Sequence, residues 1–360
     1  MKKLILNAQA AMIAGMVPAS LWAARDPNTY DGGRLPYKPL AGRSLREIAL
    51  AKEHHGSGRF VNPMGIEREG RFWQLLSWKL SSNRYAEALD RQPEISVTAD
   101  LEKIAAHRGV SLTFVKHASV LIQIGDRTLL VDPVFDEIFW FIKDFSPLAF
   151  DPQSIPGPDH VLITHGHYDH LDEASLATFA ADTHIISPLG HDRVFGGLGL
   201  KNRTRLDWYE TYADGDVTVT FLPANHWTMR NPLRGPNRSL WGGYLIEAAG
   251  GPTIYLTGDT AYFDGFAELG RDYDIDLAVF NLGAYAPRWF MAPSHMDPAE
   301  TVKAFKELNA KKLMIVHWGT FRLGDEPVHY PPKDLKRELE KEGLADRLVD
   351  IKHGDTVVLA

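Results

Sequence analysis

The sequence predicts an α/β fold in which two similar β-sheet halves pack face to face, with helices on the outside. Short apolar runs typical of β-strands alternate with helical segments from Ser111 to the C-terminus. A second observation is an internal repeat, in which a strand ends in an acidic residue and a buried strand follows after a connection. The repeat occurs once around Asp132 and once around Asp259. Two halves of related structure would produce this pattern.

The composition supports a folded protein and restricts its chemistry. The chain has 360 residues, of which 44% are hydrophobic, and a net charge of -7. Its length allows one large domain or two small ones, and its acidic balance argues against nucleic acid held by bulk charge. The absence of cysteine excludes disulfides, thiolate metal sites and cysteine nucleophiles. Any metal is therefore held by nitrogen and oxygen, and the 15 histidines are the first candidates.

Residues 1–24 have the layout of a secretory signal peptide. Lys2 and Lys3 precede an uncharged, mostly apolar stretch that ends before Arg25. The stretch is also nearly long enough to span a membrane, so an uncleaved anchor is the alternative, and a frayed apolar tail is the simplest interpretation. We expect the protein to be exported, and to be periplasmic or membrane-associated.

Residues 25–107 are interpreted as an N-terminal extension that packs on a main domain, residues 108–360. The extension is rich in Arg, Pro, Gly and Asn and contains one amphipathic segment, residues 71–80. The apolar side chains that share one helical stripe in this segment are Phe72, Leu75, Leu76 and Leu80.

A series of short apolar runs in the main domain predicts its β-strands. In chain order these runs are Leu112–Val115, Ser119–Ile124, Thr128–Val131, His160–Thr164, His184–Ser187, Val217–Leu222, Tyr244–Glu247, Thr253–Thr257, Leu277–Asn281 and Leu313–Val316. Gly125-Asp126-Arg127 joins the second run to the third, and such a short connection predicts a hairpin.

Helices are expected between and after these strands. Asp172 is a suitable N-cap for a helix that runs through Leu176 and Phe179. Another helix is expected near Phe263–Leu269. The segment Asp297-Pro298-Ala299-Glu300 has the chemistry of a helix start, and a charged helix follows Pro332.

The segment from Thr164 to His170 contains four metal-ligand residues within six positions, directly after an apolar run. His165 and His167 alternate along an extended chain, so their side chains point the same way and can share one metal. Asp169 and His170 are adjacent, point apart and can serve a second metal. Imidazole and carboxylate ligands suit zinc, and iron or manganese fit the same ligands. The alternative is a polar loop whose histidines are solvated.

This segment matches the H-x-H-x-D-H signature of the metallo-β-lactamase superfamily, which the sequence resembles. The resemblance implies an αββα sandwich with a dinuclear metal site at its edge. It also implies more distant ligands at strand ends, in the order His, Asp, His. His226, Asp259 and His317 occur in that order, each where an apolar run stops. Taken singly, each of them is also interpretable as a core polar residue, and for His226 alone the two interpretations are even.

Longer stretches resemble the N-acyl-phosphatidylethanolamine-hydrolysing phospholipase D family. These stretches are Leu206–Glu210, Leu240–Tyr244, Gly258–Thr260, Gly283–Met291 and His317–Phe321.

This resemblance implies the roles of the site residues. One zinc ion would be held by His165, His167 and His226, and the other by Asp169, His170 and His317, with Asp259 bridging the two. His295 matches an additional active-site histidine of the family. The sequence departs from the family at Lys116, at Gly166 and in the apolar segment Val134–Phe150, which puts the substrate in doubt more than the metals.

The resemblance implies a zinc-dependent phosphodiesterase that releases phosphatidic acid and an N-acylethanolamine. Two metal ions held close together lower the pKa of water and clamp a phosphoryl oxygen. Asp169 is the expected catalytic residue that orients the attacking oxygen. His295 is expected to contact the phosphate or to protonate the leaving oxygen, and its alternative is a capping contact before the helix at Asp297.

The expected substrate-binding residues are Tyr168, Arg288 and Trp289, although Arg288 and Trp289 also suit a buried structural pair. Two apolar segments, Ile138–Phe150 and Phe72–Trp78, are either a contact for acyl chains and membrane or ordinary core. The expected partners are a phospholipid and a membrane surface, with no nucleic acid, and a homodimer is allowed. The alternative functions are a metal-dependent lactonase or phosphodiesterase with a soluble substrate, and a lipid- or metal-binding protein without turnover.

Overall fold

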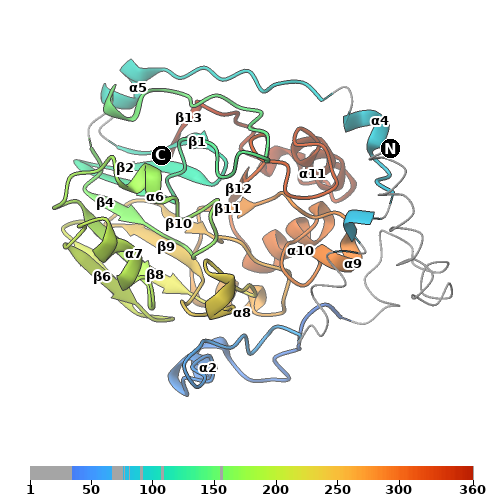
Figure 1. Cartoon of the computed structure of the whole chain (residues 1–360), viewed down its shortest axis with the longest axis horizontal. Coiled ribbons are helices and arrows are strands. Elements are labelled where there is room, and N and C mark those ends of the chain that lie inside the picture. Colours follow the sequence, from blue (N-terminus) through green and yellow to red (C-terminus); the bar gives the residue numbers. More distant parts are fainter. Residues whose placement is uncertain are drawn as a thin grey trace.

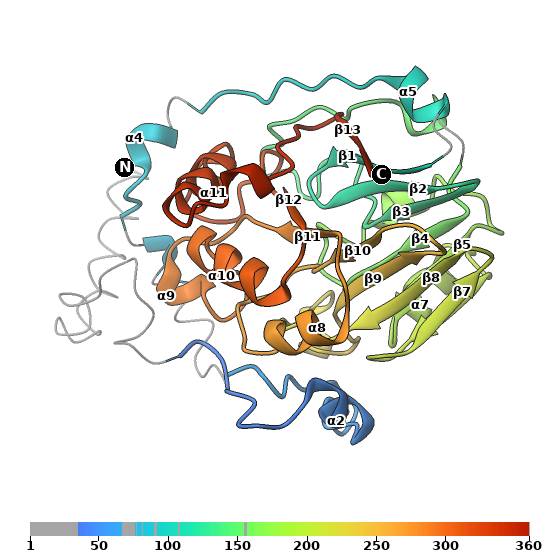
Figure 2. The ribbon, with the colours of Figure 1, turned by 180° about the vertical axis from the view of Figure 1, so that it is seen from behind.

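The computed structural model describes residues 35–66, 76, 78–80, 82–89, 92–106, 109–154 and 157–359. Within these residues two β-sheets lie between layers of helices (Figures 1 and 2). The predicted signal peptide or anchor, residues 1–24, lies outside the described residues. No helix in the described ranges has the length and apolar character that crossing a membrane requires.

The first sheet has seven strands in the order β13-β1-β2-β3-β4-β5-β6. The bounds of these strands are β1 Val110–Lys116, β2 Ser119–Ile124, β3 Arg127–Val131, β4 His160–Leu162, β5 His184–Pro188, β6 Arg203–Leu206 and β13 Thr356–Leu359. The predicted hairpin is present, because β2 pairs antiparallel with β3 and Gly125 adopts the left-handed φ of 60° that the tight turn needs.

The second sheet has six strands in the order β12-β11-β10-β9-β8-β7. The bounds of these strands are β7 Thr211–Asp214, β8 Val217–Leu222, β9 Gly243–Ala248, β10 Thr253–Leu256, β11 Leu277–Asn281 and β12 Lys312–Val316. Strands β10, β11 and β12 are parallel, and β8 runs in the same direction because β8 and β10 are both antiparallel to β9. All four strands therefore end at the same edge of the sheet.

Alternating side chains on the central strands divide the core into layers. Leu162 and Ile186 point between the two sheets. Their neighbours Val161 and Ile185 point outward and pack beneath α6 (Glu173–Leu176) and α7 (Asp192–Gly197). The outer face of the second sheet is covered by α8 (Phe266–Asp272), α10 (Pro298–Leu308) and α11 (Tyr330–Lys341). This is the predicted αββα sandwich.

Three predicted helix boundaries differ from the structure. Helix α6 begins after its N-cap Asp172 as predicted, but it ends at Leu176, and Phe179 follows in a turn that still packs against the core. Helix α8 begins at Phe266 rather than Phe263, after a turn that ends at Gly265. Helix α11 begins at Tyr330, because prolines are tolerated in the first turn of a helix. The start of α10 is as predicted, with Asp297 in a capping box.

The N-terminal part of the described chain wraps around the sandwich. Its helices are α2 (Leu45–Leu50), α4 (Ala86–Leu89) and α5 (Leu101–Ala106). Of the predicted amphipathic segment, Phe72 and Leu75 lie outside the described residues. Trp78 is buried, stacks on Phe290 of α9 (Arg288–Met291) and donates a hydrogen bond to Asp325. For Trp78, therefore, the core interpretation is the one that the structure supports.

Candidate metal centre

The seven predicted metal ligands meet at one edge of the sandwich. His165, His167, Asp169 and His170 lie in the loop between β4 and α6, and the other three follow strands of the second sheet. His226 comes shortly after β8, Asp259 after β10 and His317 directly after β12. The common direction of these strands places the three residues beside the loop from the first sheet, so both halves of the fold contribute to the site.

The first group consists of His165, His167, His226 and Asp259. His165 Nε2 lies 2.9 Å from His167 Nδ1, and His226 Nε2 lies 3.3 Å from the same atom. Asp259 Oδ2 is 3.9 Å from His165 Nε2 and 3.8 Å from His226 Nε2. Three imidazoles and one carboxylate oxygen thus face a common point.

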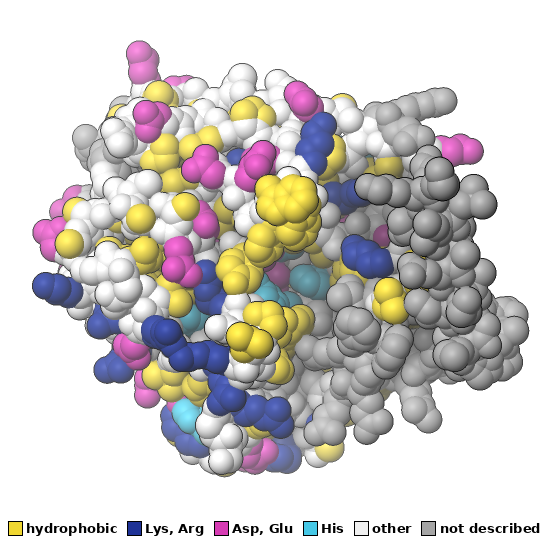
Figure 3. Space-filling model, in the orientation of Figure 1, with side chains coloured by type: hydrophobic (Ala, Val, Ile, Leu, Met, Phe, Trp, Pro, Cys, Tyr) yellow, Lys and Arg dark blue, Asp and Glu magenta, His cyan; other side chains and the backbone are white. Residues whose placement is uncertain are grey.

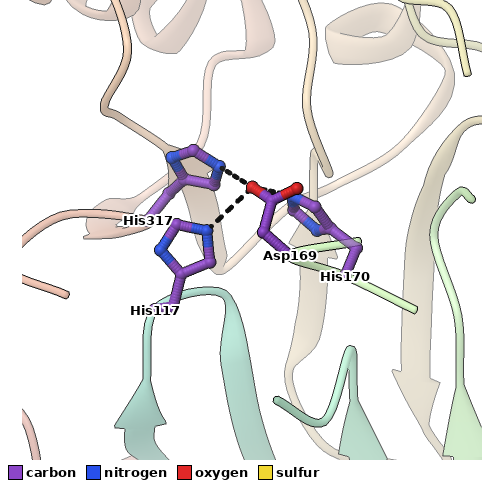
Figure 4. Close-up of side chains that lie close together, drawn as sticks. All are labelled: His117, Asp169, His170 and His317. Carbon is purple, nitrogen blue, oxygen red and sulfur yellow. Dashed lines mark hydrogen bonds and ion pairs between the residues drawn. The ribbon is translucent and has the colours of Figure 1, made fainter. Parts of the chain in front are cut away.

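The second group consists of Asp169, His170, His317 and again Asp259. Asp169 Oδ2 is 3.4 Å from His317 Nε2 and 3.5 Å from His170 Nε2, and Figure 4 shows the carboxylate between these two rings. Asp259 Oδ2 lies 3.3 Å from His170 Nε2, and Asp259 Oδ1 lies 3.4 Å from His317 Nε2. Asp259 therefore belongs to both groups, in the position that the resemblance assigns to a bridging ligand.

The residues fit a pair of divalent metal ions. Ligands about 2.0–2.2 Å from a tetrahedral ion lie roughly 3.3 Å from one another, which is the range of the contacts above. The Nε2 atoms of His170 and His317 are also buried without a hydrogen-bond partner. A buried polar atom normally has a partner, and a metal ion at this point would provide one.

Hydrogen bonds behind the ligands fix the orientation of their rings. Asp132, at the end of β3, accepts from His170 Nδ1 at 2.8 Å and from the main-chain N–H of Thr164 at 2.7 Å. His226 Nδ1 lies 2.9 Å from the carbonyl oxygen of Ser294. Such contacts select the tautomer that leaves Nε2 free for a metal.

The protonation of two histidines and two carboxylates at the site suits metal binding. For His170 and His317, burial by itself lowers the pKa, but Asp259 and Asp169 raise it above the ordinary value, so these two must lose a proton to bind a metal. Burial lowers the pKa of His165 and His226 well below the ordinary value, so both imidazoles are neutral. Burial by itself raises the pKa of Asp169 and Asp259, but the neighbouring His170 and imidazole hydrogen bonds hold both well below the ordinary value. Neutral imidazole and ionised carboxylate are the forms that bind metals.

His295 faces the same centre without joining either group. Its Nδ1 lies 3.9 Å from Asp259 Oδ2, and its ring centroid lies 5.3 Å from that of His226. Burial lowers the pKa of His295 to about 4. Because Asp297 itself caps helix α10, the capping role considered for His295 is already filled.

Arg288, predicted to bind substrate, is buried and fully engaged with the protein. Its guanidinium lies 2.6 Å from Glu300 and 3.4 Å from Asp297, and it donates to the carbonyl oxygen of His295 at 2.9 Å. The structure therefore favours the structural interpretation of Arg288, which holds the segment that carries His295. Trp289 beside it is half-buried.

Tyr168 and an aromatic loop form part of the mouth of the site. Tyr168 is 38% exposed, and Phe139 packs edge-on against it at 5.0 Å between ring centroids. Trp140 is 90% exposed and Phe141 64% exposed. Figure 3 shows histidine side chains in a hollow between groups of hydrophobic side chains. In the segment Ile138–Phe150, the tip is thus exposed, whereas Phe150 belongs to the core.

A groove of about 610 Å³ adjoins the first group of ligands. It extends from His226 and Trp227 to the N-terminal segment around Leu40 and Phe60. Both polar and apolar side chains line it.

Two residues at the centre were not predicted from the sequence. Asp132 was noticed only as the acidic residue at a strand end in the internal repeat, and that position was its signal. The sequence indicates no role for His117, which lies in the turn between β1 and β2. In the structure, its Nε2 lies 3.0 Å from Asp169 Oδ2. Its sequence signal is weak, because the residue before it departs from the family pattern.

Comparison with known proteins gives a consistent result. A family model described as a beta-lactamase superfamily domain matches residues 127–318. An N-acyl-phosphatidylethanolamine-hydrolyzing phospholipase D of Caenorhabditis elegans is 30% identical over 275 residues, which are 71% of this chain and 76% of that protein. A mitochondrial protein of the same description from Saccharomyces cerevisiae is 33% identical over 233 residues, 61% of this chain and 49% of that protein. The chain thus spans about half the length of the yeast relative.

A solved structure of a possible metal-dependent hydrolase from Veillonella parvula has the same fold. It superimposes with a TM-score of 0.58, covers 69% of this chain and 99% of its own, and is 19% identical.

Proposed function

This chain belongs to the metallo-β-lactamase superfamily and is a metal-dependent hydrolase, and from that premise we propose that it is a phosphodiesterase of the phospholipase D type. The proposed substrate is N-acyl-phosphatidylethanolamine, and the products are phosphatidic acid and an N-acylethanolamine. Relatives from a nematode and a yeast carry this activity in their names. The observation that carries the proposal is the position of Asp259, whose carboxylate lies 3.8 Å from His226 of the first group and 3.3 Å from His170 of the second.

Zinc is the proposed metal, because three imidazoles with one carboxylate are typical zinc ligands. Iron and manganese also bind imidazole and carboxylate ligands, and they are the alternatives. His165, His167 and His226 would hold one ion, Asp169, His170 and His317 the other, and Asp259 both. When bound, the pair supplies Lewis-acid activation of water and neutralises charge on phosphoryl oxygens.

The protein's own residues orient the reactants. The Oδ2 atom of Asp169 faces His317 and His170 of the second group. From there it can direct an attacking oxygen toward phosphorus. His295 is neutral at physiological pH, since burial lowers its pKa to about 4. A neutral imidazole donates one N–H, so His295 is proposed to hold a phosphoryl oxygen or the leaving oxygen. Arg288 fixes the main chain of His295 at 2.9 Å.

The mouth of the site supports a phospholipid substrate at a membrane surface. The exposed ring of Phe141 stacks on Phe139, which packs against Tyr168, and the exposed ring of Trp140 packs against Phe141. Nearby, the Tyr168 hydroxyl donates to the carbonyl oxygen of Arg230. Leu233, three residues further along that loop, is 97% exposed. Exposed aromatic and aliphatic side chains grouped around a site are typical of lipid contacts. An exported or membrane-associated location would suit this role.

The direct test uses vesicles that contain N-acyl-phosphatidylethanolamine. Zinc-loaded protein is expected to release N-acylethanolamine and phosphatidic acid, and protein stripped with a chelator is expected to release neither until zinc is restored. Mass spectrometry of both products distinguishes this cleavage from loss of an acyl chain. Zinc-loaded protein that leaves the vesicles intact but hydrolyses a soluble diester or lactone would contradict the proposed substrate.

A second candidate is a hydrolase of soluble esters, either a lactonase or a phosphodiesterase. The groove of about 610 Å³ beside His226 favours it, because polar residues such as Arg59 and Asn62 share its lining with apolar ones. The same assay separates the two candidates. A soluble substrate should be turned over at a rate that does not depend on vesicles, whereas a phospholipase should show its highest rate on the vesicle surface.

A further inference from the structure

We propose that His117 is a positioning residue of the metal centre: it donates a hydrogen bond to Asp169 Oδ2 and thereby holds that carboxylate in place for the second metal. The inference rests on the proposed pair of metals but not on the proposed substrate. His117 lies in the turn between β1 and β2, far in sequence from every predicted ligand.

The first step is the contact itself. His117 Nε2 lies 3.0 Å from Asp169 Oδ2, closer than His317 Nε2 at 3.4 Å or His170 Nε2 at 3.5 Å. In Figure 4 the carboxylate lies between the ring of His170 on one side and the rings of His117 and His317 on the other. Because a carboxylate only accepts hydrogen bonds, His117 Nε2 carries the proton and donates it.

The second step distinguishes His117 from the ligands. His170 and His317 each lie within 3.5 Å of both Asp169 and the shared carboxylate of Asp259. Among the described residues, the only carboxylate that His117 contacts within ion-pair distance is Asp169. One ring nitrogen of His117 also lies within 4.8 Å of the ligand atoms of Asp169, His170 and His317. Because His117, unlike His170 and His317, forms no ion pair with Asp259, we assign it to Asp169 rather than to the metal.

The third step is that the main chain of His117 is equally fixed. Its N–H donates to Thr320 Oγ1 at 3.0 Å, and its carbonyl oxygen accepts from the N–H of His317 at 2.7 Å. His117 adopts a left-handed φ of 51°, next to an irregularity in the pairing of β1 with β2. Bulges of this kind re-aim side chains beside active sites. One residue thus holds two ligands of the second metal, Asp169 through its ring and His317 through its main chain.

The consequence is selective for one metal. Without the imidazole, Asp169 Oδ2 loses its hydrogen bond from His117 Nε2, while His165, His167 and His226 keep all of their contacts. Removing a hydrogen-bond partner of a ligand typically weakens metal affinity 10–100-fold. The second metal should therefore bind about 10–100-fold more weakly in His117→Ala, and the first metal should bind as before.

The experiment counts zinc per chain during titration with a competing chelator. Wild type is expected to release both zinc ions over one narrow range of chelator concentration. His117→Ala is expected to release one of its two ions at a much lower chelator concentration than wild type. His117→Gln should restore most of the affinity, because its amide N–H can reach Asp169 from a similar position. The matched control is His353→Ala, since His353 is equally buried and lies 3.3 Å from the same Thr320 Oγ1 but contacts no ligand.

The outcomes separate the inference from the proposed function. Retention of two tightly bound ions in His117→Ala, or an equal loss in His353→Ala, would overturn the role of His117 and leave the metal pair intact. Wild type that binds fewer than two ions would overturn both. X-ray absorption gives a further check: one histidine fewer around zinc in His117→Gln than in wild type would show that His117 is a ligand, contrary to the proposal. Retention of the first ion shows that each variant is folded.

Discussion

At the scale of single residues, the metal centre depends on polar groups that stand behind the ligands. Asp132 is buried and accepts hydrogen bonds from His170 Nδ1 and from both the N–H and the hydroxyl of Thr164. Asn281 donates to Asp259 Oδ1 at 2.9 Å. These contacts leave the metal-facing atoms with one orientation each, so the site is organised before any ion binds.

Gly166 illustrates how a departure from a family pattern is accommodated. A Cβ at this position would lie 2.8 Å from both His191 Cε1 and Thr228 Oγ1. Thr228 Oγ1 also accepts the N–H of Gly166 at 3.0 Å. The space that a bulkier residue would need is therefore filled by His191 and Thr228, and glycine is required at this point of the loop.

The role of His295 predicts a change in turnover without a change in metal content. His295→Ala should lower kcat by about 100-fold or more, the usual cost of removing one hydrogen-bond donor to an oxygen that gains charge in the transition state, with two zinc ions still bound because His295 joins neither ligand group. Steady-state kinetics together with zinc analysis checks this. His329→Ala is the control, since His329 is a half-buried histidine that stacks edge-on against Tyr330 and belongs to none of the groups of candidate metal ligands among the described residues. Loss of zinc from His295→Ala would show that this residue is a ligand.

At the scale of elements, Asp207 fastens the N-terminal segment to the sandwich. The carboxylate, after β6, lies 2.6 Å from both His54 Nε2 and Lys52 Nζ and 2.7 Å from His55 Nε2. His54 is buried and stacks on Trp208 at 4.2 Å. His54 and His55 are neighbours in the sequence, and both contact the Asp207 carboxylate. These contacts give the pair a structural role in holding the N-terminal segment.

This contact predicts a stability that depends on pH. Burial alone would raise the pKa of Asp207, but hydrogen bonds from His54 and Lys52 hold it below the ordinary value. The carboxylate therefore stabilises the fold above its unfolded pKa of about 3.9, and this contribution is lost as pH falls toward the lower folded pKa. Asp207→Asn should lower the unfolding free energy by about 3 kcal/mol at pH 7, and by less at pH 3.

Urea unfolding of metal-free protein at the two pH values measures this difference. The control is Asp350→Asn, which breaks an exposed pair with Lys336 and should cost less than about 1 kcal/mol at either pH. A loss for Asp207→Asn that is the same at pH 3 as at pH 7 would refute the electrostatic explanation.

The loop that carries Phe139, Trp140 and Phe141 is held by a buried lysine. Lys116 is 2% exposed, forms a short ion pair with Asp144 and donates to the carbonyl oxygen of Phe135 at 3.0 Å. The departure from the family at Lys116 and the unusual apolar segment Val134–Phe150 are therefore linked, because the Lys116 amine holds Phe135 and Asp144 on either side of the exposed rings.

Lys116→Met is expected to loosen this loop and to affect lipid substrates selectively. KM for vesicles should rise several-fold, with little change for a soluble diester, and hydrogen exchange should increase in residues 136–143. Lys143→Met, an exposed lysine in the same loop, is the control. An equal rise in KM for both kinds of substrate would show that the loop acts on the metal centre and not on the lipid.

At the scale of the whole molecule, the sequence predicts the layers better than their edges. The central strands are apolar runs, and the structure contains all of them with small changes at the ends. Strands β6, β7 and β13 were not predicted: Arg203–Leu206 and Thr211–Asp214 are polar, and all three strands are short and only partly buried. Polar strands at a sheet edge lack the periodicity on which such predictions depend.

The same distinction applies to the metal centre. Four of its seven candidate ligands were predicted from a local signature, and the other three from the family resemblance, which implies ligands at strand ends in the order His, Asp, His. His117 and Asp132 were not, since they act through hydrogen bonds between segments that are distant along the chain. Only the pairing of β1, β2, β3 and β4 brings those segments together.

The central claim is that the two halves of the sandwich hold one pair of metals through the carboxylate of Asp259. The most direct measurement is zinc per chain in wild type and in Asp259→Ala, with Asp274→Ala as an exposed acidic control. Wild type and the control should each bind two zinc ions, and Asp259→Ala should bind at most one and lose hydrolysis, because both ligand groups lose an oxygen. Two zinc ions retained in Asp259→Ala would contradict the account.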